Sequence, residues 1–288
     1  MKQKVGIVTD STSCIPKELV DKHNICVVPL MIVVEGRGYR DGIDITPGEV
    51  YKIMRRRENL PTTSTPSVGD FLSTFHKIGE QAESILCINV TSLQSKTYDT
   101  AVVALGIARE EMPATKIEVL DSRAASSALG LIVVEAARAA ERGADLPEVI
   151  NVVRNIVQRV NYLAIIDDLY YLARTGRIGR ASAWAGTMLN IKPIVGHDTS
   201  IGLTIPVERP RTKAKAISRL LELMANKIGD SPVHVIVNHA DEQEEGERLK
   251  AEIASRFKCA ELHLTEFTPS MGVHAGPGIL GAAFFTGE

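Results

Sequence analysis

The fold is decided by residues 84–111, SILCINVTSLQSKTYDTAVVALGIAREE, in which a strand passes directly into a helix. Ser84 to Val90 is a short apolar run rich in β-favouring residues, which is typical of a buried strand. A polar crossover follows at Thr91-Ser92-Leu93-Gln94-Ser95, and a helix is predicted from Thr97 to Glu111. A strand that leads into a helix in this way is the repeating unit of parallel sheets.

The same unit recurs on both sides of this stretch. The predicted strand at Val5 to Val8 leads into Asp10-Ser11-Thr12-Ser13, and the strand at Ile117 to Leu120 leads into Asp121-Ser122 and a helix from about Ser126 to Arg142. A β-rich run from Ile25 to Val34 is interrupted by Pro29. We therefore expect a first α/β domain with a mostly parallel sheet covered by helices on both faces.

The second half of the chain has a different order of predicted strands and helices. Its predicted elements are a strand at 161–166, a short helix capped by Asp167-Asp168 and ending at Arg174-Thr175-Gly176-Arg177, a helix at 181–189, a hairpin around Asp198-Thr199-Ser200, a helix at 212–228, a strand at 233–237, a helix at 242–257 and two final strands. The hairpin among strand–helix units predicts a smaller α/β domain with a mixed sheet. We place the two domains at residues 1–157 and 158–288.

Length and composition narrow the class of protein. A chain of 288 residues favours two domains, and a hydrophobic content of 44% is ample for a buried interior. The net charge of −2 offers no electrostatic argument for nucleic acid as a partner. The four cysteines are scattered, which favours reduced thiols, and no apolar run approaches the length of a membrane span. We expect a cytoplasmic protein without integral membrane association.

Five hydroxyl residues are packed into Thr62-Thr63-Ser64-Thr65-Pro66-Ser67, directly ahead of a predicted helix from Gly69 to Ile78. Serine and threonine at such a position cap the free N–H groups of a helix. The same helix end also attracts anions. Taken alone, the run is more simply read as a cap, and a carboxylate or phosphate site is the alternative.

Several sequence motifs of nucleotide-binding and catalytic sites are not matched by this chain. The segment Gly276 to Gly281 matches the glycine pattern of dinucleotide sites, but only seven residues remain after it, too few for the required helix and acidic residue. The sequence contains no Walker A motif, no G-x-S-x-G and no H-E-x-x-H. Local motifs for nucleotide binding, serine hydrolysis and zinc chemistry are therefore absent from the sequence.

Two further segments suit an anion. Arg174-Thr175-Gly176-Arg177 places two guanidinium groups around a glycine turn, and guanidinium groups bind carboxylates and phosphates well. His274-Ala275-Gly276-Pro277-Gly278 places a histidine in backbone that can pass close to a ligand. Each is also compatible with an ordinary helix end or turn.

Read together, the polar segments resemble the DegV family over essentially the whole chain. The resemblance is carried, in order, by Asp10-Ser11-Thr12-Ser13; Thr63-Ser64-Thr65-Pro66-Ser67; Thr91-Ser92-Leu93-Gln94-Ser95-Lys96-Thr97-Tyr98; Asp121-Ser122 with Ser126 and Gly130; Tyr171-Leu172-Ala173-Arg174-Thr175-Gly176-Arg177-Ile178; and His274-Ala275-Gly276-Pro277-Gly278.

The resemblance implies a non-catalytic protein that binds a long-chain fatty acid between two α/β domains. Members of this family include the acyl-carrier subunit of bacterial fatty-acid kinase, which presents the bound carboxyl group to a separate ATP-dependent kinase subunit. The expected partners are therefore the fatty acid and such a kinase subunit. No metal and no cofactor beyond the bound fatty acid is expected.

The resemblance also assigns site residues. Thr63 and Ser95 are expected to hold the carboxylate, and Arg174 and His274 to support its charge near the mouth of the site. The full set of expected ligand-binding residues is Thr63, Ser64, Ser95, Lys96, Arg174, His274 and Gly276. The sequence departs from the family pattern at Lys96, where glycine is usual, and at Thr175, which replaces the first glycine of a Gly-Gly-Arg pattern.

The sequence leaves some alternatives open. The apolar segments at 129–134 and 184–191 can line an acyl cavity or belong to an ordinary core. A lipid-directed hydrolase or acyltransferase would use Ser95 or Ser64 with His274. A lipid-sensing regulatory protein would use the same binding site.

Overall fold

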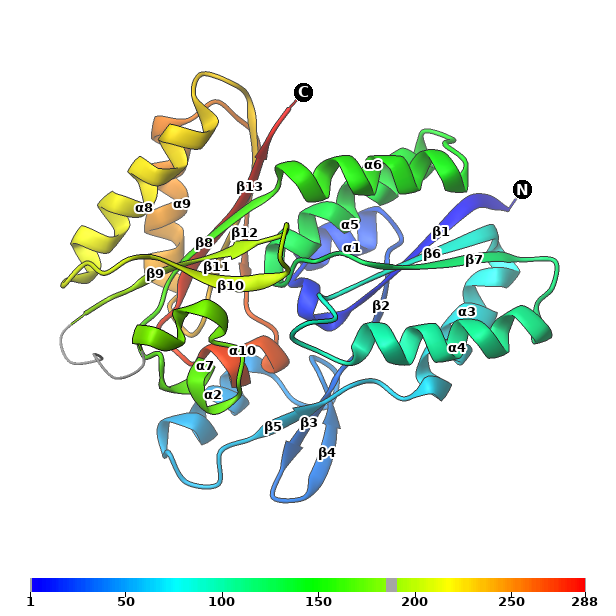
Figure 1. Ribbon diagram of the computed structural model, residues 1–288, viewed down its shortest axis with the longest axis horizontal. Coiled ribbons are helices and arrows are strands. Elements are labelled where there is room, and N and C mark those ends of the chain that lie inside the picture. Colours follow the sequence, from blue (N-terminus) through cyan, green and yellow to red (C-terminus); the bar gives the residue numbers. More distant parts are fainter. Residues whose placement is uncertain (1, 185–190, 288) are drawn as a thin grey trace.

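The computed structural model describes residues 2–184 and 191–287, which form two α/β units packed side by side (Figure 1). The first unit is built on a parallel sheet with the strand order β2-β1-β6-β7. These strands are β1 (Gln3–Asp10), β2 (Cys26–Val28), β6 (Ala82–Asn89) and β7 (Lys116–Asp121). The expected parallel sheet is confirmed.

Helices cover both faces of the parallel sheet. One face carries α3 (Val68–Gln81) and α4 (Thr97–Glu111), whereas the other carries α1 (Lys17–Lys22), α5 (Ser126–Glu141) and α6 (Leu146–Arg159). Side chains of β6 alternate between the two layers, since Ile85 and Cys87 pack with α3 and α4 while Leu86 and Ile88 pack with α5. A strand buried on both faces explains the uninterrupted apolar run in the sequence.

The second unit is built on a mixed sheet of six strands. Its order is β10-β9-β8-β13-β11-β12, and only the pair β11–β12 is parallel. The strands are β8 (Asn161–Ile165), β9 (Ile194–Asp198), β10 (Leu203–Glu208), β11 (Val233–His239), β12 (Cys259–Glu266) and β13 (Leu280–Thr286). Helices α8 (Lys213–Ile228) and α9 (Gln243–Arg256) cover one face. The mixed sheet agrees with the expected fold class.

Helix α5 lies between the two sheets. Its residues pack in one hydrophobic cluster with β1 and β6 of the parallel sheet and with Ile236, Ala283 and Phe285 of the mixed sheet. The apolar segment 129–134 therefore belongs to the core. Because α5 contacts both sheets, the domain boundary proposed at residues 157 and 158, in the last turn of α6, stays a prediction.

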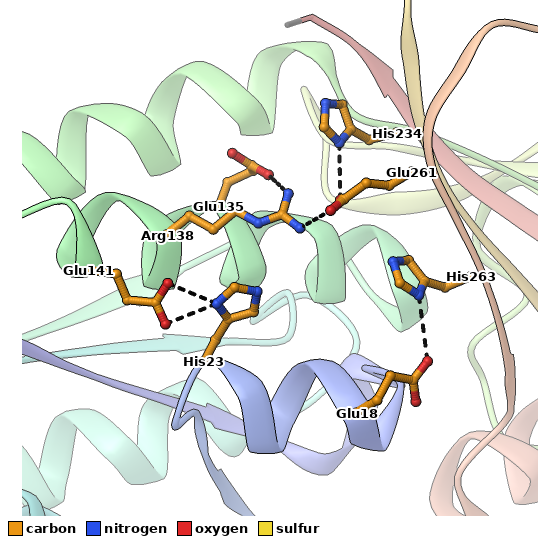
Figure 2. A network of polar contacts seen from close by, with 8 residues as sticks. All are labelled: Glu18, His23, Glu135, Arg138, Glu141, His234, Glu261 and His263. Atoms are coloured by element: carbon orange, nitrogen blue, oxygen red, sulfur yellow. Dashed lines mark hydrogen bonds and ion pairs between the residues drawn. The ribbon is translucent and has the colours of Figure 1, made fainter.

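A network of polar contacts links α1 and α5 to the edge of the mixed sheet (Figure 2). Arg138 on α5 donates hydrogen bonds to Glu135 at 2.7 Å and to Glu261 on β12 at 2.5 Å, and His234 on β11 contacts Glu261 at 3.2 Å. Two histidine–glutamate pairs flank this centre: His23 with Glu141, and His263 with Glu18. Two of the pairs, Arg138 with Glu261 and His263 with Glu18, connect the first unit to the mixed sheet.

A third, antiparallel sheet has the order β4-β3-β5 and packs near α2 (Pro47–Arg55). Its strands are β3 (Met31–Val34), β4 (Arg37–Arg40) and β5 (Thr62–Ser64). The hydroxyl run is thus divided. Ser67 caps α3 with Asp70 in a reciprocal pair of hydrogen bonds, as expected of a cap, whereas Thr62 to Ser64 form an edge strand paired with β3.

The remaining elements are short. They are 3-10 turns at Ser11–Ser13 and Gly179–Trp184 and the helices α7 (Tyr170–Arg174) and α10 (Pro269–Ala275). The segment predicted to be helical at 181–189 is a 3-10 helix up to Trp184, and residues 185–190 lie outside the described residues. Within the ranges 2–184 and 191–287, no helix combines the length and apolarity needed to cross a membrane.

Candidate functional site

A cavity of about 350 Å³ lies where the three sheets meet. It is within the range of roughly 300–1,000 Å³ that is usual for small-molecule sites. Its walls combine apolar and hydroxyl-bearing side chains from both units: Thr12, Leu30, Thr63, Ser64, Thr65, Val90, Gln94, Ser95, Lys96, Ala125, Ser126, Tyr162, Ala164, Ile166, Leu172, Arg177, Val195, Gly196, His197, Thr204, Phe267, Met271, His274, Ala275 and Ile279.

One wall of the cavity is formed by alternate residues of a β-strand. Tyr162, Ala164 and Ile166 alternate along and just beyond β8, so they share one face of the mixed sheet. Val195 on β9 is paired with Ala164 and extends the same wall. Since this face is turned toward the first unit, the mixed sheet supplies an extended apolar surface for a ligand.

The mouth of the cavity contains a contact between two residues that are far apart in the sequence. Oγ1 of Thr63, on β5, lies 2.8 Å from Nε2 of His274, on α10. The pairing of Thr63 with Ile32 of β3 fixes the strand, and α10 presents the imidazole in its last turn. The structure therefore brings together two of the expected site residues.

His274 is a neutral imidazole at the mouth. Burial lowers the pKa of His274, and the cations Arg177 and Arg174 lower it further, to about 3. Its Nδ1 atom is shielded from solvent and has no hydrogen-bond partner among the residues described. A neutral imidazole cannot form an ion pair with a carboxylate, so any balancing charge at this mouth must come from another side chain.

Arg177 supplies that charge. Its half-buried side chain lines the cavity, and its Nε donates a hydrogen bond to the Gln94 carbonyl at 3.0 Å. Burial lowers the pKa of Arg177, but a guanidinium group stays protonated at neutral pH. No acidic side chain within the described ranges forms an ion pair with Arg177. Nη1 of Arg177 also donates to the Thr175 carbonyl, so the described partners of this cation are neutral backbone carbonyls and its charge is left for an anionic ligand to balance.

Arg174, the arginine expected from the sequence, has a different position. It is exposed, does not line the cavity, and donates to the carbonyls of Leu60 at 3.2 Å and Pro61 at 3.4 Å. Arg174 ends α7, and the left-handed turn at Gly176 (φ +74°) reverses the chain before Arg177. The turn therefore places the second arginine, rather than the first, at the cavity.

Ser95 and Lys96 lie where the polar crossover enters α4. Ser95 Oγ accepts a hydrogen bond from the Thr97 amide at 3.2 Å and lies 2.9 Å from Thr97 Oγ1. Lys96 lines the mouth, but its side chain is 79% exposed and its Nζ pairs with Asp99 at 2.9 Å. The extra charge at Lys96 is therefore largely exposed to solvent and paired with Asp99, at the border of the cavity. Ser64 is an exposed residue at the same mouth.

Gly276 does not line the cavity and has a packing role. It ends α10 with φ +80°, and a Cβ at this position would lie 2.3 Å from Cδ2 of Tyr171. A side chain here would therefore collide with the aromatic ring and would also occupy a conformation that favours glycine. Gly276 thus allows the C-terminal end of α10, the helix that carries His274, to pack closely against Tyr171.

Two buried carboxylates support the same region. Asp41 accepts hydrogen bonds from Ser11 Oγ at 2.5 Å and from the Ser270 amide at 3.1 Å, which ties the start of α10 to the first unit. Asp10 accepts from the amides of Thr12 and Val90, both of which line the cavity. Burial raises the pKa of both carboxyl groups, against the effect of these hydrogen bonds.

Comparison with known proteins agrees with this architecture. A family model described as "Uncharacterised protein, DegV family" matches residues 4–287. The chain belongs to the DegV family. The DegV domain-containing protein TTE1491 of Caldanaerobacter subterraneus is 35% identical over 283 residues, which cover 98% of this chain and 99% of that protein.

Solved structures of similar proteins show the same fold. A DegV family protein from Thermus thermophilus, described by its fatty-acid binding, has a TM-score of 0.91 at 29% identity and covers 98% of this chain and 99% of its own. A stearic-acid-binding protein from Eubacterium ventriosum has a TM-score of 0.90 at 26% identity, with 99% and 98% covered. The resemblance seen in the sequence is therefore confirmed at the level of family and fold.

The DegV site includes cavity residues that the sequence did not single out. Gln94 donates from Nε2 to Thr204 Oγ1 at 2.9 Å, and both line the cavity together with Arg177 and Tyr162. Gln94 was visible within the family segment and Arg177 within the arginine turn, whereas Thr204 and Tyr162 lie on strands without any local polar motif. Groups of His, Cys, Asp and Glu suited to a metal ion do not occur in the described part of this DegV chain.

The low pKa of His274 in this DegV protein predicts a pH dependence of stability. The folded pKa of about 3 lies below the ordinary value of 6.5, so the unfolded chain binds a proton that the folded chain does not. This difference lowers the free energy of unfolding as pH falls from about 6.5 toward 3. We expect the unmodified protein to lose about 2 kcal/mol more than His274→Gln between pH 7 and pH 4.5. Urea denaturation at each pH measures it.

Parallel profiles for the unmodified protein and His274→Gln would show that the folded state does not disfavour protonation of His274.

Proposed function

We propose that this DegV family protein binds a long-chain fatty acid, with its acyl chain in the cavity and its carboxylate at the mouth. The observation that carries the proposal is Arg177, a half-buried guanidinium group beside a mostly apolar cavity with no ion pair among the described residues. A half-buried cation without a charged partner is stabilised by an anion. Fatty-acid binding by the similar Thermus and Eubacterium proteins supports the same ligand class.

The free energies are consistent with such a ligand. Burying each CH₂ gains about 0.8 kcal/mol, so a tail of about sixteen carbons offers on the order of 10 kcal/mol before the costs of association. Removing the carboxylate from water costs several kcal/mol unless it is paired and hydrogen-bonded. Arg177, Thr63 and Ser95 are the groups that offset this cost in the proposal.

Thr63 and His274 would act as a unit. In the arrangement we infer, the neutral His274 donates its Nε2–H to Thr63 Oγ1, which leaves the threonine hydroxyl proton to the carboxylate. Nδ1 is then an acceptor, which suits its lack of a partner among the described residues better than a buried N–H would. Ser95 adds a second hydroxyl from the start of α4.

In this role the protein is a carrier without catalysis of its own. It presents the carboxylate of the bound fatty acid to a separate ATP-dependent kinase subunit, as the family resemblance implies. A hydrolase based on Ser95 and His274 is not favoured, because Ser95 is bonded to Thr97 and His274 to Thr63. The pKa of about 3 makes His274 a weak base, and no carboxylate in the described residues orients its Nδ1.

Binding of stearic acid and of octadecanol to the delipidated protein tests the proposal. We expect Thr63→Ala and Ser95→Ala each to weaken stearic acid about 10-fold, because each removes a hydrogen bond to a charged group, and to leave octadecanol within about 2-fold. Isothermal titration calorimetry measures both ligands. Thr62→Ala is the matched control, since Thr62 is exposed on the same strand and does not line the cavity.

Failure of the unmodified protein to bind stearic acid would contradict the proposed function. Equal losses for the acid and the alcohol would instead remove Thr63 and Ser95 from the carboxylate site while leaving the ligand class intact.

A further inference from the structure

The wall of the cavity that the mixed sheet forms contains a second polar site, which we call the polar point. It consists of Tyr162 and Ser126 at the cavity and of Asn238 and Ser127 behind them. The Tyr162 hydroxyl lies 3.4 Å from Oδ1 of Asn238. Asn238 donates from Nδ2 to Ser127 Oγ at 2.6 Å and to Ser126 Oγ at 3.3 Å. Tyr162 and Ser126 both line the cavity, whereas Asn238 and Ser127 are completely buried behind them. The group therefore presents a phenol and a hydroxyl to the ligand space.

The fold leaves room for this arrangement at Gly281. Gly281 on β13 is paired with Ala164 of β8 on one side and with Asn238 of β11 on the other. A Cβ at residue 281 would lie 2.8 Å from the Tyr162 oxygen and 2.9 Å from Asn238 Oδ1. Only a residue without a side chain lets the phenol cross β13 to reach Asn238. The polar point is thus built by the packing of three adjacent strands.

The polar point is separated from the carboxylate end. Tyr162 and Ile166 lie four residues apart along β8, which corresponds to about 13 Å for extended backbone. Ile165, next to Ile166, is paired with Leu280 at the start of β13, the strand that follows α10 and His274, whereas Tyr162 is paired with Ala283, three residues further along β13. A chain that runs from the mouth along this wall therefore meets Tyr162 well beyond its carboxyl carbon.

A plain hydrocarbon chain cannot form hydrogen bonds with the side chains of the polar point. Burial raises the pKa of Tyr162, so the phenol is protonated at neutral pH and is a hydrogen-bond donor. Its 3.4 Å contact with Asn238 is longer than the usual 2.5–3.0 Å of a bond from a hydroxyl to an oxygen, and its other side-chain partner is Ser126, which itself lines the cavity. A wall adapted to saturated chains alone would gain more from an aliphatic side chain at this position.

We propose that the cavity accepts fatty acids that carry a hydroxyl or oxo group on the acyl chain, with this oxygen hydrogen-bonded by Tyr162 and Ser126. The inference rests on the proposed function, since it concerns the tail of the same ligand. It adds a ligand class that the apolar walls alone would disfavour, because an unpaired polar group in hydrocarbon surroundings weakens binding.

Binding of hydroxystearic acids to the delipidated full chain tests the inference. The series moves a single hydroxyl along the chain, with stearic acid as reference. We expect one or two positional isomers to bind at least as tightly as stearic acid. Tyr162→Phe should weaken those isomers about 5- to 10-fold and leave stearic acid within about 2-fold, because it removes one donor and no apolar area.

Tyr170→Phe is the matched control, since Tyr170 is exposed on α7 and does not line the cavity, and it should alter no ligand. Unchanged binding of stearic acid also shows that Tyr162→Phe is folded. The inference is overturned if every hydroxy isomer binds more weakly than stearic acid by a factor that Tyr162→Phe does not change. Absence of binding for stearic acid and all isomers would overturn the proposed function, and this inference with it.

Discussion

Arg177→Met is expected to lower the affinity for stearic acid about 100-fold while leaving the affinity for octadecanol within about 3-fold. The methionine keeps much of the length and apolar contact of the arginine but removes the charge that we assign to the ligand carboxylate. Leaving a buried carboxylate without its partner costs about 3 kcal/mol, which corresponds to this factor. Calorimetric titration of the delipidated variant with both ligands measures the difference.

Arg174→Met tests whether the loss of affinity is specific to Arg177 or reflects the total positive charge of the turn at 174–177. Arg174 lies three residues earlier, is exposed and does not line the cavity, so its replacement should weaken stearic acid less than about 3-fold. Similar losses in the two variants would contradict the assignment of Arg177 to the carboxylate. Because Arg177 also donates to the Gln94 carbonyl, thermal unfolding of each variant shows whether stability has changed.

Gly276→Ala is expected to lower the free energy of unfolding by about 3 kcal/mol. Its Cβ would lie 2.3 Å from a ring carbon of Tyr171, a distance that real Cβ contacts do not reach, and the backbone at φ +80° disfavours any side chain. Relief requires movement of α10 or of the Tyr171 ring. Since α10 carries His274, fatty-acid binding should weaken together with stability. Urea denaturation and calorimetry measure the two effects.

Gly143→Ala is the matched control, because Gly143 has a similar φ of +88° and open space where its Cβ would lie. It should show only the backbone cost, about 1 kcal/mol. Equal losses at the two positions would mean that the collision with Tyr171 is relieved without cost. In that case the packing role of Gly276 would have to be abandoned.

Much of the fold could be predicted from local pattern. The strand–helix units at 84–111 and 117–142 appear as β6–α4 and β7–α5 with only small shifts at their ends. Burial on both faces makes a parallel strand apolar throughout, and capping side chains mark where a helix begins. Both signals are carried by neighbouring residues, so a single sequence is enough to find them.

Other elements depended on partners distant in the sequence. Thr62 to Ser64 form a strand because they pair with β3, about thirty residues earlier, and nothing within the hydroxyl run itself distinguishes that pairing from a helix cap. The segment 129–134 was open to two interpretations because a helix buried between two sheets and a helix beside a ligand cavity have the same apolar composition. Only the packing of the second sheet onto α5 decided between them.

Local sequence patterns are sufficient for the α/β class, the membership in the DegV family and the set of hydroxyl, histidine and arginine side chains from which a carboxylate site is proposed. The tertiary structure decided which of them meet: Thr63 reaches His274 across 211 residues, and the turn at Gly176 brings Arg177 rather than Arg174 to the cavity. The physical reason is that periodicity and capping record the local environment of a residue. A cavity instead arises between surfaces whose distance is set by packing across the whole chain.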